Sequence, residues 1–173
     1  MKDLMLDLET LGTGNNAVIT QIGACYFDPM TGVIDEKTLS VNIDFKESIK
    51  RGFEVDAETI KFWFELPDKS RTFLKDPVSI ECAMSLFRAF SYRCERVWSD
   101  AIFDFVLLTN LYTRMGKKPP INFRQCRDIR TLMTLAEIER EKIEREDAHD
   151  ALSDCIYQVG YCSKSFQKIR FQK

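Results

Sequence analysis

The chain is poor in the residues and segments that mark several common protein classes. It has only one histidine, and its six cysteines include no Cys-x-x-Cys pair, which argues against a zinc site. No apolar run approaches the roughly 20 residues that are needed to cross a bilayer. The N-terminal sequence, MKDLMLDLE, lacks the pattern of a secretory signal. We therefore expect a cytoplasmic protein with no membrane partner.

The sequence also lacks an internal repeat and a recognisable domain boundary. Its 173 residues are enough for one domain with a proper core, and 45% hydrophobic with 30% charged residues is typical of a soluble globular protein. We expect a single domain over residues 1–173, with a polar tail that frays after about residue 163.

An apolar run at residues 4–8 contains Asp7 and is followed by Glu9, and a buried strand does not normally contain such acids. Side chains alternate across a strand, so Asp7 and Glu9 share one face. Two neighbouring carboxylates repel each other unless they share a proton or bind a cation, and oxygen ligands suit Mg²⁺ or Mn²⁺. The alternative is that both acids merely mark the exposed end of the strand.

The remaining pattern predicts an α/β fold with a mixed central sheet. Three strands in an antiparallel meander come first, and helices then alternate with short strands. The predicted strands cover residues 4–8, 18–27, 33–43, 96–99 and 122–126. The predicted helices cover residues 60–66, 77–94, 100–115, 128–138 and a last segment that begins near residue 148. The charged segment 137–147 is typical of a solvated helix or a mobile loop.

The single histidine lies close to an aspartate in the sequence AHDALSD. Five residues along a regular helix would put His149 and Asp154 on different faces. They converge only if His149 lies at the mouth of the helix and Asp154 lies within it. Alternatively, His149 caps the helix or is simply exposed.

Three short motifs resemble those of the DEDDh branch of the DnaQ-like 3′-to-5′ exonuclease superfamily, which includes RNase T, oligoribonuclease and polymerase proofreading domains. The motifs are DLET at residues 7–10, FD at residues 103–104 and HDALSD at residues 149–154. Each is weak alone, but all three occur in order. The segment RDIRTL at residues 127–132 further resembles small RNase T-like members from phages and bacteria.

The resemblance implies a ribonuclease H-like sheet flanked by helices and assigns the site residues. His149 would be the general base, and the four metal ligands would be Asp7, Glu9, Asp104 and Asp154. The motif spacing leaves Asp150 without a role, and Asp100 departs from the pattern. By analogy with RNase T-like enzymes, candidates for substrate binding are Thr10, Leu11, Phe103 and Trp63. Trp63 lies in the aromatic cluster at residues 62–64, for which the core is the favoured position.

The resemblance implies a two-metal-ion enzyme that releases nucleoside monophosphates from the 3′ end of single-stranded or overhanging DNA or RNA. A homodimer is a further expectation. Two divalent cations would add four positive charges and bring the net charge from −2 to +2, so the charge does not exclude a nucleic-acid partner. Basic residues also gather late in the chain, at Lys117, Lys118, Arg124, Arg127, Arg130 and residues 164–173.

Two alternatives remain open at this point. A ribonuclease H-type endonuclease shares the carboxylate chemistry, but it would not need the motif around His149. A non-catalytic nucleic-acid-binding domain of the same fold would not need all five site residues. Stabilisation by Mg²⁺ or Mn²⁺ separates this second alternative from an enzyme, because four clustered acids should bind the metal.

Overall fold

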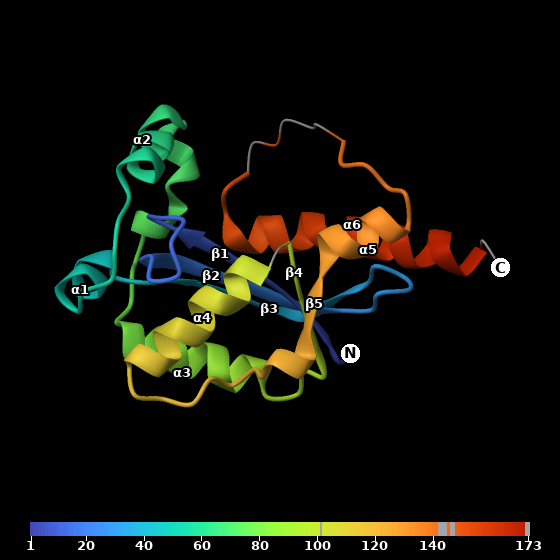
Figure 1. Ribbon diagram of the computed structural model, residues 1–173, viewed down its shortest axis with the longest axis horizontal. Helices are drawn as coiled ribbons and strands as arrows, with labels where there is room; N and C mark the ends of the chain where they lie inside the picture. Colours follow the sequence, from blue (N-terminus) through green and yellow to red (C-terminus); the bar gives the residue numbers. More distant parts are fainter. Residues whose placement is uncertain (101, 142–144, 146–147, 172–173) are drawn as a thin grey trace.

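The computed structural model describes residues 1–100, 102–141, 145 and 148–171. In these residues a sheet of five strands has the spatial order β3-β2-β1-β4-β5, with helices on both faces (Figure 1). β1 pairs antiparallel with β2 and β2 antiparallel with β3, whereas β4 and β5 join in parallel. The mixed sheet and its opening meander confirm the predicted α/β class.

The strands lie close to the predicted segments and are β1 (Asp3–Thr10), β2 (Ile19–Phe27), β3 (Ile34–Asn42), β4 (Arg96–Ser99) and β5 (Cys126–Asp128). The α-helices are α1 (Phe45–Lys50), α2 (Ala57–Glu65), α3 (Ile80–Ser91), α4 (Ile102–Arg114), α5 (Ile129–Leu135) and α6 (Ala151–Phe171). Short 3₁₀ helices are η1 (Asp68–Ser70), η2 (Thr72–Leu74) and η3 (Phe123–Gln125). None of the helices in these described parts of the chain is long and apolar enough to cross a membrane.

β1 separates two apolar layers, as its alternating pattern predicts. Leu4, Leu6 and Leu8 pack into the core that α3 and α4 cover. Met5 packs on the opposite face, in a second core that α5 and α6 cover. Asp7 and Glu9 follow Met5 at two-residue intervals, so they point to the α6 side of the sheet.

The start of α6 lies directly on β2. A Cβ atom built on Gly23 would come within 2.2 Å of the Ala151 carbonyl carbon, so only glycine permits this approach. Gly23 is paired with Asp7 across the strands. The contact therefore places the first turn of α6 beside the acidic residues of β1.

Two predictions about the second half of the chain were wrong. The last strand is β5, not residues 122–126, because the Asn122 side chain caps η3 and exchanges hydrogen bonds with Gln125 in a capping box. The tail after residue 163 does not fray but continues α6 to Phe171. Phe166 stabilises this extension, because its ring lies 5.4 Å from that of Trp98.

The charged segment is only partly described. Residues 138–141 and Arg145 belong to neither a regular helix nor a strand. Residues 142–144 and 146–147 of the predicted solvated segment lie outside the described residues.

Candidate active site

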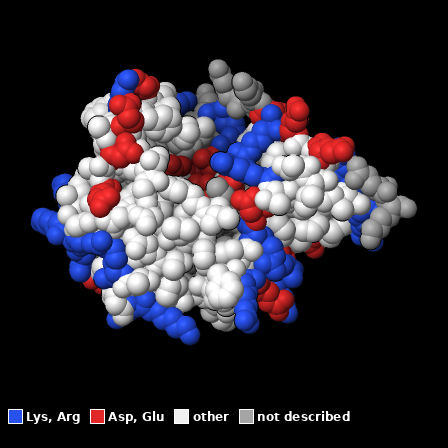
Figure 2. All heavy atoms as spheres, viewed as in Figure 1, with Lys and Arg blue, Asp and Glu red and all other residues white. Residues whose placement is uncertain are grey.

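The four predicted carboxylates come from three elements that meet at one edge of the sheet. Asp7 and Glu9 belong to the end of β1, Asp104 to the first turn of α4 and Asp154 to the first turn of α6. Because β1 and β4 are parallel, both deliver the following chain to the same edge. Figure 2 shows acidic side chains gathered in a hollow between α2 and α6, with basic side chains beside them.

Asp7 is at the electrostatic centre of this group. Burial raises the pKa of Asp7 well above its ordinary value, and the charges of Asp104, Glu9 and Asp154 raise it further. The opposing contribution is a 2.7 Å hydrogen bond that Gln158 Nε2 donates to the Asp7 carboxylate. The other three carboxylates are therefore close enough to Asp7 to repel it.

Two more of these acids hold protons more tightly than usual. Burial, reinforced by the charges of Asp154 and Asp104, raises the pKa of Glu9 to about 8. Burial raises the pKa of Asp104 to about 7, although a backbone hydrogen bond from Leu8 and the charge of Arg130 lower it. Such a group of oxygen donors fits Mg²⁺ or Mn²⁺, which would relieve the repulsion.

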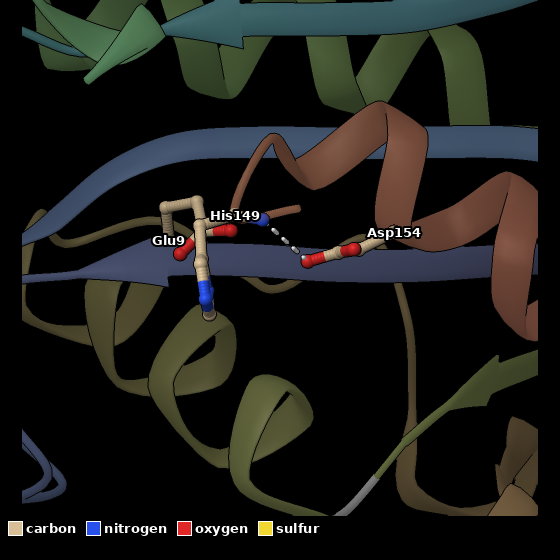
Figure 3. Close-up of side chains that lie close together, drawn as sticks. All are labelled: Glu9, His149 and Asp154. Carbon is tan, nitrogen blue, oxygen red and sulfur yellow. Dashed lines mark hydrogen bonds between the residues drawn. The ribbon is translucent and has the colours of Figure 1, made fainter. Parts of the chain in front are cut away.

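His149 lies within this group at the mouth of α6, the position in which it can meet Asp154. Three side chains come close together here: Glu9, His149 and Asp154 (Figure 3). Each offers one possible ligand atom, these atoms lie within 4.8 Å of one another, and the three could hold a metal ion. The His149 backbone N–H also donates to the Asp154 carboxylate over 3.2 Å. His149 has a φ of 65°, a left-handed conformation that residues with a Cβ seldom adopt.

Arginines surround the acids on the α6 side. Arg145 forms an ion pair with Asp154, and its guanidinium lies over the Tyr157 ring at 4.1 Å from the centroid. Asp100, whose role the sequence left open, forms ion pairs with Arg130 and Arg140. Asp100 therefore holds two arginine side chains next to the acidic site.

A cleft of about 550 Å³ adjoins Glu9, and only two of the four predicted substrate-binding residues line it. Thr10 and Trp63 line it, together with Glu9 and Phe62. Trp63 is only 3% exposed, and its indole N–H donates to the Thr10 carbonyl over 2.8 Å. Leu11 and Phe103 do not line this cleft. Leu11 is buried, and Phe103 packs against the core.

Sequence reasoning missed two residues of the site. Gln158 follows Asp154 by four positions on α6, and this helical spacing was the signal that could have found it. Phe62 is 40% exposed, lines the cleft and meets the His149 ring with centroids 5.0 Å apart. The aromatic cluster at residues 62–64 was the signal, since one of its rings could border a cleft, but the sequence does not say which of three adjacent rings does so.

A match to a protein family supports the resemblance that the motifs indicated. Residues 2–166 match the family described as the 3′-5′ exoribonuclease Rv2179c-like domain. The chain belongs to this family. The Rv2179c-like domain is thus a 3′-5′ exonuclease domain, as the motifs indicated. No curated protein matches the chain in sequence.

Two solved structures share the fold of this Rv2179c-like domain. Cell-death related nuclease 4 (CRN-4) has a TM-score of 0.52 at 14% identity, over 98% of this chain and 64% of that nuclease, which is less than two thirds of its length. A full-length 3′-exonuclease has a TM-score of 0.54 at 13% identity, over 95% of this chain and 81% of the other. At these identities the likeness shows the fold alone.

The raised pKa values predict how the stability of the metal-free Rv2179c-like domain depends on pH. The folded state binds protons more tightly than the unfolded chain at Glu9 and Asp104, so its stability should fall as pH rises from about 4 to about 8. Urea unfolding in EDTA across this range measures the effect. Adding Mn²⁺ should stabilise the domain more at pH 8 than at pH 5, since protons and cations compete. Stability that increases with pH in EDTA would contradict the arrangement of the acids.

Proposed function

We propose that this domain removes nucleoside monophosphates from 3′ ends by two-metal-ion hydrolysis. The observation that carries the proposal is the convergence of His149 with four carboxylates whose charges repel one another. If these acids had only a structural role, replacing them with uncharged residues would make the fold more stable. Four mutually repelling carboxylates are best explained as ligands of cations.

Each site residue has a defined task in this proposal. Asp7, Glu9, Asp104 and Asp154 would hold two divalent cations, Mg²⁺ or Mn²⁺, which would stabilise charge on the attacking and leaving oxygens. His149 accepts the proton of the attacking water as general base. Its imidazole reaches the acidic group beside Glu9, where the water would lie.

The substrate is proposed to be a single-stranded or overhanging 3′ end, because the terminal nucleotide must reach acids that are recessed and mostly buried. RNA is the favoured polymer, since the family is described as exoribonucleases. Arg130 and Arg140, which flank the acids through Asp100, would contact backbone phosphates. A homodimer and a cytoplasmic location stay predictions.

The cleft beside Glu9 is the proposed place for the terminal nucleoside. The residues first suggested for substrate binding remain proposals, and they are Thr10, Leu11, Phe103 and Trp63. Thr10 and Trp63 have the best position, because they line the cleft. Phe62 joins them, since its ring is the more exposed one.

Separate substitutions of the two rings should give different results. Phe62→Ala should raise KM by roughly 5-fold to 150-fold, because stacking on a base contributes about 1 to 3 kcal/mol. Trp63→Ala should lower the free energy of unfolding by about 3 to 5 kcal/mol, because Trp63 is buried against Phe73 with ring centroids 4.8 Å apart. Thermal unfolding and oligonucleotide kinetics measure both. If Trp63→Ala were as stable as the wild type, its assignment to the core would be wrong.

Digestion of matched 5′-labelled RNA and DNA oligonucleotides with Mn²⁺ tests the proposed function. The account predicts a ladder of products that shorten one nucleotide at a time from the 3′ end, with RNA degraded faster. Equal rates would remove the RNA preference only. Internal cuts from the start would favour the ribonuclease H-type endonuclease, and no products at all would favour a binding domain.

A further inference from the structure

The two residues after His149 are anchored to β2 by one buried side chain, Gln21. Gln21 Nε2 donates to the Asp150 carboxylate over 3.1 Å, and Gln21 Oε1 accepts from the Ala151 N–H over 2.8 Å. Gln21 is 1% exposed, so its amide lies where a hydrogen bond is stronger than in water. An amide has both a donor and an acceptor, and here both fix the chain immediately after His149.

Asp150 connects this anchor to two other segments. Its carboxylate accepts a 2.9 Å hydrogen bond from the Thr72 hydroxyl of η2 and a 3.1 Å hydrogen bond from the Ser153 N–H in α6. Asp150 therefore ties β2, η2 and the first turn of α6 together. A residue that the family motif leaves without a role is thus among the most connected groups beside the site.

The strand register places this anchor next to the catalytic acids. Gln21 lies directly opposite Glu9, and Gly23 lies opposite Asp7. Side chains of directly opposed residues point to the same face of a sheet. Since α6 begins against Gly23, the sheet itself sets how far His149 lies from Glu9.

The backbone of His149 needs such support. Its left-handed φ of 65° persists in proteins only where the surroundings impose it. The imidazole makes T-shaped ring contacts with Phe62 and Trp63, with centroids 5.0 Å and 6.1 Å apart. These rings lie beside the imidazole, so its direction depends on them and on how the backbone of His149 is held.

We propose that Gln21 and Asp150 are positioning residues that hold His149 in this conformation, with its imidazole facing the carboxylates. The inference rests on the proposed function, in which His149 is the general base. Neither residue touches the reacting atoms in this role. They act only through the backbone that carries His149.

Gln21→Met is the most direct test, because methionine fills similar space without a hydrogen-bonding amide. We expect kcat to fall by about 10-fold to 100-fold, as is usual when a catalytic group loses its support, with little change in KM. The rise in melting temperature on adding Mn²⁺ should match that of the wild type, since all four carboxylates remain. A loss of this Mn²⁺ effect would overturn the inference, because the defect would then lie in the metal ligands.

A matched pair of variants at Thr72 tests the same inference if Gln21→Met does not fold. Thr72→Val removes the hydroxyl that donates to Asp150, whereas Thr72→Ser keeps it. We expect a lower kcat for Thr72→Val and recovery towards the wild-type value for Thr72→Ser. Equal kcat values for the two variants would overturn the role of Asp150.

A double-mutant cycle with His149→Ala separates positioning from a general structural effect. If Gln21 acts through His149, Gln21→Met should cost no further kcat once His149 is alanine. The same fold-loss in both backgrounds would overturn the inference. If Gln21→Met has the kcat of the wild type, the positioning role is wrong but the proposed function stands. If the wild-type protein releases no nucleotides, the proposed function and this inference are both wrong.

Discussion

Replacing Asp7 with asparagine is expected to abolish hydrolysis and leave the protein folded. Asparagine keeps an oxygen that can accept the 2.7 Å hydrogen bond from Gln158, so the change removes charge and little else. Losing one ligand charge at a two-cation site should cost several kcal/mol of transition-state stabilisation, or roughly 1,000-fold or more in rate. Single-turnover digestion of a labelled oligonucleotide measures the loss.

The same variant should be at least as stable as the wild type without metal. The half-buried Asp7 carboxylate is repelled by three neighbouring acids, and asparagine removes that repulsion. Melting temperatures in EDTA and in Mn²⁺ test this, with a smaller Mn²⁺ shift expected for Asp7→Asn. Glu36→Gln is the matched control, because it makes the same change of charge at an exposed position on edge strand β3. Full activity in Asp7→Asn would refute the assignment of metal ligands.

The second large effect is expected for His149→Ala, which should lower turnover by about 100-fold to 10,000-fold, the usual contribution of a general base. All four carboxylates remain, so Mn²⁺ should raise the melting temperature as much as in the wild type. This contrast separates His149 from Asp7, whose replacement should impair both turnover and metal-induced stabilisation.

A pH-rate profile tests the role of His149 more specifically. Wild-type activity should fall at acid pH, because a protonated imidazole cannot accept the proton of the attacking water. His149→Ala should lack this loss of activity at acid pH and show a flatter pH-rate profile. An unchanged profile together with an unchanged rate would mean that another group is the base.

The elements that carry the acids could be predicted because their signals are local. Alternation in β1 separated Asp7 from the leucines, and the resemblance to the exonuclease motifs pointed to Asp104 and Asp154. The first turn of α6 had to start after His149 for the histidine to meet Asp154, and it begins at Ala151. Short-range periodicity predicted the strand, and short motifs carried the resemblance that suggested the remaining acids.

Other parts depend on contacts that no local pattern contains. Gln21 and Gly23 lie in an entirely buried strand, and their importance follows only from the register with β1 and the approach of α6. Helix α1 has six residues, too few for a periodic pattern to identify it. Likewise, the choice between Phe62 and Trp63 depends on which face of α2 packs against Phe73.

The account's central claim is that four carboxylates hold two cations beside His149, and crystals grown with Mn²⁺ test it most directly. Anomalous scattering should reveal two manganese ions about 3.5 to 4 Å apart. Their ligands should include Asp7, Glu9, Asp104 and Asp154, with Arg145 displaced from Asp154. Crystals that diffract well and show no manganese at these carboxylates, even at saturating Mn²⁺, would contradict the account.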